Sequence, residues 1–232
     1  MNKLLIIGNW KCNPTTLAKA KQLFNSVKKG IKKIKNIEVV ICPPFVYLSV
    51  LAASAKGYGG LRFGSQDCFW EDKGSFTGEI SPAMLKDTGC EYVIIGHSER
   101  RKYQKETDEM INNKIKAALK AGLKVILCIE KIIQIKKDLK NIKKEQLKNL
   151  IIAYEPIFAI GTGKPCAVEK AKKMRNVIGN ILKINPVLYG GSVNSQNAND
   201  YIEKAGFQGL LIGSASLNPK EFLAIVKNIS KN

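Results

Sequence analysis

The chain of 232 residues is poor in the side chains that most often build metal centres. It has a single histidine, His97, and none of its six cysteines forms a Cys-x-x-Cys pair, so few of the usual ligands for a metal site are present. No apolar run approaches the roughly 20 residues that a membrane-spanning helix needs, and the segment 1–11 resembles a strand more than a signal peptide. We therefore expect a cytoplasmic protein with reduced cysteines, no metal and no membrane partner.

Acidic residues and arginine are also scarce. There are 19 Asp and Glu residues against 38 Lys and Arg residues, four of them arginine, which gives a formal net charge of +19. Clustered cations are the usual basis of nucleic-acid binding, but the excess is lysine on the polar faces of expected helices. This pattern is typical of a solvated surface, so we expect no nucleic-acid partner, while the positive potential would speed the arrival of an anionic substrate.

Short apolar runs are abundant and recur along the whole chain. They are Leu4-Ile7, Ile37-Cys42, Leu61-Gly64, Tyr92-Ile95, Val125-Ile129, Leu150-Ala153, Val187-Tyr189 and Leu210-Ile212. Each has the length of a strand, and most are rich in β-branched residues. Near-continuous apolar strands are typical of a parallel sheet that is covered on both faces.

Helical patterns lie between these runs. One apolar stripe comprises Leu17, Ala20, Phe24, Val27 and Ile31, and another comprises Ile111, Ile115, Ala118 and Leu119. The second pattern stops at Gly122, a residue type that favours helix C-termini. Asn218 followed by Pro219 supplies an N-cap and a first-turn proline for the last helix.

The alternation of strand and helix predicts an α/β fold without an internal linker. About eight strand-plus-helix units fit a (β/α)8 barrel, a closed parallel sheet surrounded by helices, forming one domain over residues 1–232. An open doubly wound sheet is the structural alternative. Both architectures place chemistry at the carboxyl ends of the strands.

Polar residues follow the first and fourth apolar runs. Asn9 and Lys11 come after the first run, where an ordinary polar turn is the plainer interpretation. His97 and Glu99 come after the fourth, and the position of the only histidine at a strand end favours a functional role. We interpret the two arginines that follow, at 100 and 101, as members of a structural ion-pair network.

A carboxylate, Glu155, ends the sixth apolar run. An unpaired carboxylate in an apolar mouth is costly, and the loop 156–164 that follows has the length and the glycines of a lid. Gly161 to Lys164 superficially resembles a nucleotide loop, but the residues required of a P-loop or of a dinucleotide-binding fingerprint are missing. We therefore predict a base with a lid.

Small residues follow the seventh and eighth runs. Ser192 ends a Gly-Gly-Ser turn, and Gly213 is followed by Ser214. Such turns let main-chain N–H groups approach an anion closely, and barrels often bind phosphate at these two positions. A tight turn that binds no ligand would explain either of these two turns alone. It explains less well why both turns occur in one chain together with Gly161.

Taken together, these motifs resemble those of the triosephosphate isomerase family. The matching segments span nearly the whole chain in family order: Gly8-Asn9-Trp10-Lys11, Gln66-Asp67, Gly74-Ser75-Phe76-Thr77-Gly78-Glu79, Ile95 to Arg101, Tyr154 to Lys164 and Tyr189-Gly190-Gly191-Ser192-Val193.

The resemblance implies a TIM barrel that interconverts dihydroxyacetone phosphate and D-glyceraldehyde 3-phosphate through an enediolate, without a cofactor. It implies Glu155 as the base, a neutral His97 as the electrophile, and Lys11 and Asn9 as further donors to the substrate. It also implies a phosphate site at Gly161, Ser192, Gly213 and Ser214, with Glu99 in support. The rival interpretation within the same fold is another phosphate-sugar epimerase or synthase.

The resemblance further implies a homodimer. The segment Asp72 to Glu79 matches the loop that inserts into a second subunit, where the counterpart of Thr77 reaches the neighbouring site.

Three features depart from the family pattern. The fifth run ends Cys128-Ile129-Glu130 without the usual glycine before the glutamate, and the region from there to Leu150 is short and rich in lysine. Gly213-Ser214 stands where two glycines are usual. Serine keeps its main-chain N–H, so we expect phosphate binding to be retained.

Overall fold

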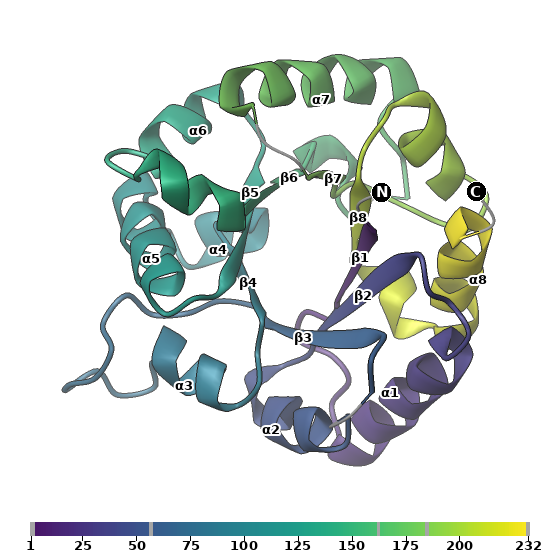
Figure 1. The fold of residues 1–232 in the computed structure, drawn as a ribbon, viewed down its shortest axis with the longest axis horizontal. Helices are drawn as coiled ribbons and strands as arrows, with labels where there is room; N and C mark the ends of the chain where they lie inside the picture. Colours follow the sequence, from purple (N-terminus) through teal and green to yellow (C-terminus); the bar gives the residue numbers. More distant parts are fainter. Residues whose placement is uncertain (1–2, 56–57, 162, 184–185, 231–232) are drawn as a thin grey trace.

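Eight parallel strands close into a barrel in chain order (Figure 1). The computed structural model describes residues 3–55, 58–161, 163–183 and 186–230. The strands are β1 (Leu4–Asn9), β2 (Ile37–Cys42), β3 (Leu61–Ser65), β4 (Tyr92–Ile95), β5 (Lys124–Ile129), β6 (Leu150–Tyr154), β7 (Val187–Tyr189) and β8 (Gly209–Ile212). The closed sheet confirms the expected (β/α)8 barrel and excludes the open doubly wound sheet.

Helices surround the barrel (Figure 1). They are α1 (Leu17–Ile31), α2 (Phe45–Ala53), α3 (Pro82–Asp87), α4 (Ser98–Tyr103), α5 (Asp108–Lys120), α6 (Ile132–Asp138), α7 (Val168–Leu182) and α8 (Pro219–Ser230). Among the described residues, no helix is both long enough and apolar enough to cross a membrane.

Both faces of the strands are buried, which explains why the strands appear in the sequence as unbroken apolar runs. One buried cluster fills the barrel: Leu5, Ile7, Val40, Cys42, Tyr92, Ile94, Ile126, Cys128, Ile151, Ala153, Leu188 and Leu211. Alternate residues such as Ile6 and Val39 belong to the larger cluster that includes the helices. The period of two along each strand thus divides the apolar side chains between two cores.

The barrel closes where β1 pairs with β8, and a glycine is required there. Gly209 lies opposite Leu5 in the register, and a Cβ atom on it would lie 1.9 Å from the Leu5 carbonyl oxygen. Since that contact would be with main chain, which cannot rotate away, only glycine fits this position of the seam.

The Thr16 side chain accepts a hydrogen bond from the Lys19 N–H (3.3 Å) and caps α1, which was not predicted from the sequence. The helix ends predicted at Gly122 and Asn218 agree with the structure. Gly122 follows α5 with φ +76°, and Asn218 Oδ1 accepts the Lys220 N–H (3.0 Å) at the start of α8. Four of the five residues in the apolar stripe predicted for α1 are buried. Leu17, its first residue, is 38% exposed, because the buried part of the helix begins one turn later.

The short region after β5 folds as α6 and a 3₁₀ turn at Lys144–Asn149 that leads directly into β6. Gln134 Oε1 accepts hydrogen bonds from the N–H groups of Glu130 (2.8 Å) and Lys131 (2.9 Å). The side chain of Gln134 therefore satisfies two main-chain N–H groups just before α6.

Candidate active site

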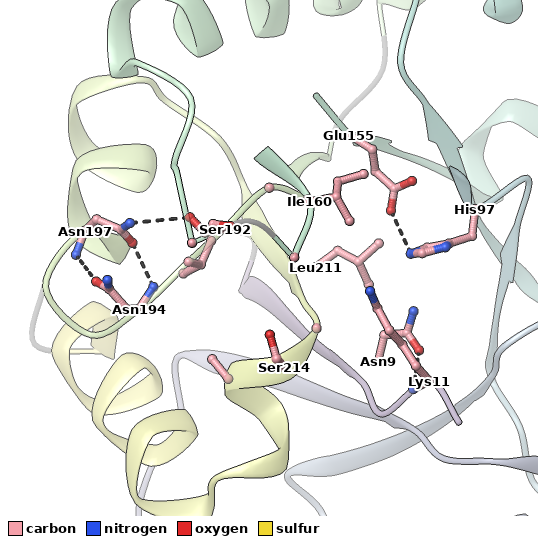
Figure 2. Close-up of a pocket in the computed structure, with 17 residues that line it drawn as sticks. Asn9, Lys11, His97, Glu155, Ile160, Ser192, Asn194, Asn197, Leu211 and Ser214 are labelled. Atoms are coloured by element: carbon pink, nitrogen blue, oxygen red, sulfur yellow. Dashed lines mark hydrogen bonds and ion pairs between the residues drawn. The ribbon is translucent and has the colours of Figure 1, made fainter. Parts of the chain in front are cut away.

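The polar residues predicted at the strand ends meet at one cavity of about 220 Å³ (Figure 2). It lies at the carboxyl ends of the strands, since parallel strands in a barrel share one such end. The lining residues are Asn9, Lys11, His97, Glu155, Ile160, Gly161, Gly163, Gly190, Gly191, Ser192, Val193, Asn194, Asn197, Leu211, Gly213, Ser214 and Ala215. All eight residues predicted to be catalytic or to bind phosphate therefore line the same cavity.

Glu155 follows β6 and is 2% exposed. Both of its oxygens are engaged: Oε1 is 3.1 Å from Nε2 of His97, and Oε2 accepts the main-chain N–H of Ser98 (3.1 Å). A Cβ atom on Gly190 would lie 3.0 Å from Cγ of Glu155, so a glycine in the next strand end leaves room for the carboxylate. Burial raises the pKa of the neighbouring Cys128 thiol, and the Glu155 carboxylate raises it further, so the thiol stays neutral.

His97 caps α4 with its own side chain. Nδ1 accepts the N–H of Glu99 (3.2 Å), and an acceptor at Nδ1 requires a lone pair there. The proton of a neutral imidazole is therefore on Nε2, the nitrogen that faces Glu155 and the cavity (Figure 2). This tautomer presents a hydrogen-bond donor to any oxygen bound in the cavity.

Lys11 is held in an unusual main-chain conformation. Its φ of +52° lies in the left-handed region, which non-glycine residues seldom occupy outside sites that require it. Two contacts hold it there: Asn9 Oδ1 accepts the Lys11 N–H (3.0 Å), and Gln66 Nε2 donates to the Lys11 carbonyl (2.8 Å). The ammonium forms an ion pair with Glu99 (2.5 Å), so Glu99 contacts Lys11 without lining the cavity.

The small turns after β7 and β8 form the other end of the cavity. Gly161, Ser192, Gly213 and Ser214 all line it. A Cβ atom on Gly213 would lie 3.3 Å from Cε of Lys11, so the lysine stem passes close to this turn. The arrangement combines small residues with a nearby cation, as anion sites do.

The lining residues that the sequence did not indicate include Leu211, Asn194 and Asn197. Asn197 Oδ1 accepts the Asn194 N–H (2.9 Å), while Asn194 Oδ1 accepts the Asn197 N–H (3.0 Å) (Figure 2). These reciprocal bonds build the turn beyond Ser192. The Asn-x-x-Asn spacing directly after the glycine turn was the signal that could have indicated it.

Contacts with other elements hold the expected lid segment on both sides of its glycines. Ser192 Oγ donates to the Ala159 carbonyl (2.5 Å), and the Lys170 ammonium lies 4.8 Å from the ring centre of Phe158. Beyond the glycines, Tyr189 Oη accepts the Cys166 N–H (3.0 Å). Position 162, within the expected lid, lies outside the described residues.

Thr77 lies outside the cavity, in an exposed segment between β3 and α3 that projects from the barrel (Figure 1). Gly74 and Gly78 in this segment have positive φ values of 144° and 93°. A Phe69–Phe76 ring contact with centroids 4.9 Å apart packs the projection against its own base.

The two arginines after His97 form the ion-pair network expected of them. Arg100 contacts Asp67 (2.9 Å) and Glu106 (2.6 Å), and the buried Lys114 ammonium bonds to the same two acids. Burial raises the pKa of Asp67 to about 6 despite the Lys114 charge. Arg101 contacts two further carboxylates.

The described residues contain no group of three or more His, Cys, Asp or Glu side chains placed to hold a metal ion.

Comparisons with known proteins agree on one family. The family model described as triosephosphate isomerase matches residues 4–229. A triosephosphate isomerase of Dehalococcoides mccartyi is 42% identical over an alignment of 247 residues, which covers 98% of this chain and 96% of the relative. That of Aquifex aeolicus is 41% identical over 244 residues, covering 96% and 98%. A crystal structure of triosephosphate isomerase from Bartonella henselae matches with a TM-score of 0.84 and 32% identity, over 97% of this chain and 98% of that one.

Proposed function

The chain belongs to the triosephosphate isomerase family, and we propose that Glu155 and His97 carry out its reaction. That reaction is the interconversion of dihydroxyacetone phosphate and D-glyceraldehyde 3-phosphate. Neither the family model nor the relatives favour the rival epimerase, synthase or nucleic-acid-binding functions.

The observation that carries the proposal is the buried pair of Glu155 and His97 at the cavity. Isomerisation requires removal of a proton from the carbon beside a carbonyl, and a buried carboxylate is a suitable base. The Glu155 oxygens lie 3.1 Å from donors on His97 and Ser98, which hold the base beside the cavity. Glu155 takes the proton from one carbon and returns it to the next.

Donors aimed at the substrate oxygens stabilise the enediolate. Its negative charge develops on two neighbouring oxygens, and fixed donors there lower the barrier most. The Nε2–H of His97 supplies one donor, and Lys11 and Asn9 supply others from the end of β1 (Figure 2). The Glu99 carboxylate holds the Lys11 ammonium in place.

The phosphate end lies at Gly161, Ser192, Gly213 and Ser214. Small residues at these positions let main-chain N–H groups approach the phosphate oxygens, and the Lys11 charge adds to the attraction. Ser214, where a second glycine is usual, keeps its N–H, so it serves equally well as a donor.

The segment 156–164 acts as a lid over this phosphate end. Ile157 and Phe158 are about half exposed, and closure over the cavity would bury apolar surface while excluding water. Exclusion of water protects the enediolate from losing its phosphate.

A homodimer is supported by apolar side chains around the projecting segment. Val46, Phe76, Met84 and Tyr103 are between 43% and 76% exposed, and they belong to segments that follow β2, β3 and β4. A dimer interface over these segments would cover these apolar side chains. The segment Asp72 to Glu79 would then carry Thr77 into the site of the partner subunit.

Sedimentation velocity is expected to give a dimer at micromolar protein. Replacing residues 73–78 by a short Gly/Ser turn is expected to give a monomer with low turnover. The matched control is Val177→Ser, which removes an exposed apolar residue of α7 away from this surface. A shortened protein that is monomeric and fully active would contradict the role of Thr77.

The composition supports a cytoplasmic location, where this reaction has its substrates and where the six unpaired thiols would stay reduced. The net charge of +19 favours the arrival of a doubly charged phosphate ester.

The test of the function is an isomerase assay on the purified chain. D-glyceraldehyde 3-phosphate is supplied, and the dihydroxyacetone phosphate formed is reduced by a coupled dehydrogenase that consumes NADH. Rapid NADH loss that depends on the protein supports the proposal, whereas a folded protein without turnover contradicts it.

A further inference from the structure

The turn that carries His97 rests on a guanidinium group. Arg101 Nε donates to the carbonyl oxygen of Gly96 (2.9 Å), the residue directly before His97. Gly96 has φ +72°, and a Cβ atom on it would lie 3.0 Å from an Arg101 terminal nitrogen. The arginine therefore packs against the main chain from which the imidazole projects.

Two carboxylates from different helices hold this guanidinium. Asp108 at the start of α5 accepts from one terminal nitrogen (2.8 Å), and Asp138 at the end of α6 accepts from the other (2.5 Å). The Asp108 side chain is 30% exposed, whereas the Asp138 side chain is fully buried. The last residue of α6 thus contacts the arginine that supports the turn before His97.

The main chain of Asp138 is fixed as well. Asn112 of α5, itself buried, donates through Nδ2 to the carbonyl oxygens of Asp138 (2.7 Å) and Lys140 (2.9 Å). This contact sets the position of the carboxyl group relative to α5, so Arg101 has a rigid partner.

Charged groups of both signs face the Asp138 carboxyl. They are Arg101 on α4 and Asp108 on α5, with Lys137 on its own helix paired to Asp108 (3.2 Å). Burial, with Asp108 in support, raises the pKa of Asp138 to about 7 against the opposing effect of Arg101. Its Oδ1 atom is buried without a hydrogen-bond partner among the described residues.

We propose that Asp138 is a positioning residue for His97, acting through Arg101 and the Gly96 carbonyl to fix the direction of Nε2. This inference rests on the proposed function for the role of His97 in turnover. Its Oδ2 atom accepts from Arg101, and this contact holds the guanidinium against the Gly96 carbonyl.

Asparagine and alanine at position 138 separate positioning from mere packing. Asp138→Asn keeps an acceptor for Arg101, so turnover close to that of the unchanged protein is expected. Asp138→Ala removes this acceptor and is expected to lower kcat about tenfold with little change in KM, as misplacement of a reacting group does. Asp200→Asn is the control, since it removes an exposed carboxylate from a surface pair with Lys204.

Imidazole ¹⁵N NMR reads out the position of His97 without turnover, because His97 is the only histidine. In the unchanged protein and in Asp138→Asn, one sharp pair of ¹⁵N signals with the proton on Nε2 is expected. In Asp138→Ala, shifted or exchange-broadened signals are expected. If Asp138→Ala fails to fold, kcat and the imidazole signals of Asp138→Asn test the proposal instead.

The proposal would be overturned if Asp138→Ala left the imidazole signals and kcat unchanged, or if Asp200→Asn changed them as much as Asp138→Ala does. It would also be overturned if Asp138→Asn lowered kcat about tenfold, as is expected for Asp138→Ala. Failure of the proposed function would appear differently, as absent turnover in the unchanged protein, and the NMR comparison would still test the positioning of His97.

Discussion

Replacing Glu155 by glutamine is expected to lower kcat about 10³-fold, because the reaction loses the base that removes and returns the proton. The amide is nearly the same size as the carboxylate but cannot accept a proton at neutral pH. It also cannot accept from both His97 and Ser98, the two donors that lie 3.1 Å from the Glu155 oxygens, since one side of the amide is itself a donor.

Inorganic phosphate distinguishes loss of the base from damage to the cavity. Its inhibition constant against the substrate is expected to change little in Glu155→Gln, since Gly161, Ser192 and the turn at Gly213 are untouched. Glu155→Asp is the matched variant: it keeps the carboxylate but withdraws it by one methylene, and a displacement of about 1 Å costs about 10²-fold. Near-normal turnover in the glutamine variant would remove Glu155 from the mechanism.

Deleting residues 157–161 is expected to lower turnover about 10²-fold and to divert the intermediate toward loss of phosphate. The shortened segment can no longer cover the phosphate end, so water reaches the enediolate and the fixed donors lose their advantage. Glu155 remains at the end of β6, so proton abstraction itself continues. The measurement is inorganic phosphate released per triose isomerised.

Phe158→Ala is the control for this deletion. It removes the contact with Lys170 but keeps the length of the segment, and it is expected to alter the rate far less and the partition hardly at all. The same ratio of phosphate release to isomerisation in the deleted and unchanged proteins would contradict water exclusion as the purpose of the lid.

The barrel could be predicted from the sequence because the apolar runs that form its strands can be recognised in short stretches of sequence. A strand that is covered on both faces consists of an apolar run, and the runs at 37–42, 92–95 and 187–189 coincide with β2, β4 and β7. Asn9, His97 and Glu155 could be predicted to meet, since parallel strands share one carboxyl edge. Leu17 shares the predicted apolar stripe of α1 but is exposed, because periodicity does not say where along a helix the covered part begins.

Other features depend on contacts between distant elements, which no local pattern encodes. The hydrogen bond from the Cys166 N–H to Tyr189 Oη joins residues that are 23 positions apart. The full burial of Asp138 depends on how α6 packs against α4 and α5, and from its sequence it resembles an acid in a lysine-rich surface helix. The tautomer of His97 likewise follows from the Glu99 N–H, whose direction is set by α4.

Isomerisation in ²H₂O tests most directly whether a protein base transfers the proton. The chain is given D-glyceraldehyde 3-phosphate in ²H₂O, and the dihydroxyacetone phosphate formed is examined by ¹H NMR. A base such as Glu155 exchanges its proton with solvent before returning it, so a sizeable fraction of the product is expected to carry one deuterium at C1. Rapid formation of product without any deuterium at C1 would contradict proton transfer through a base that exchanges with solvent.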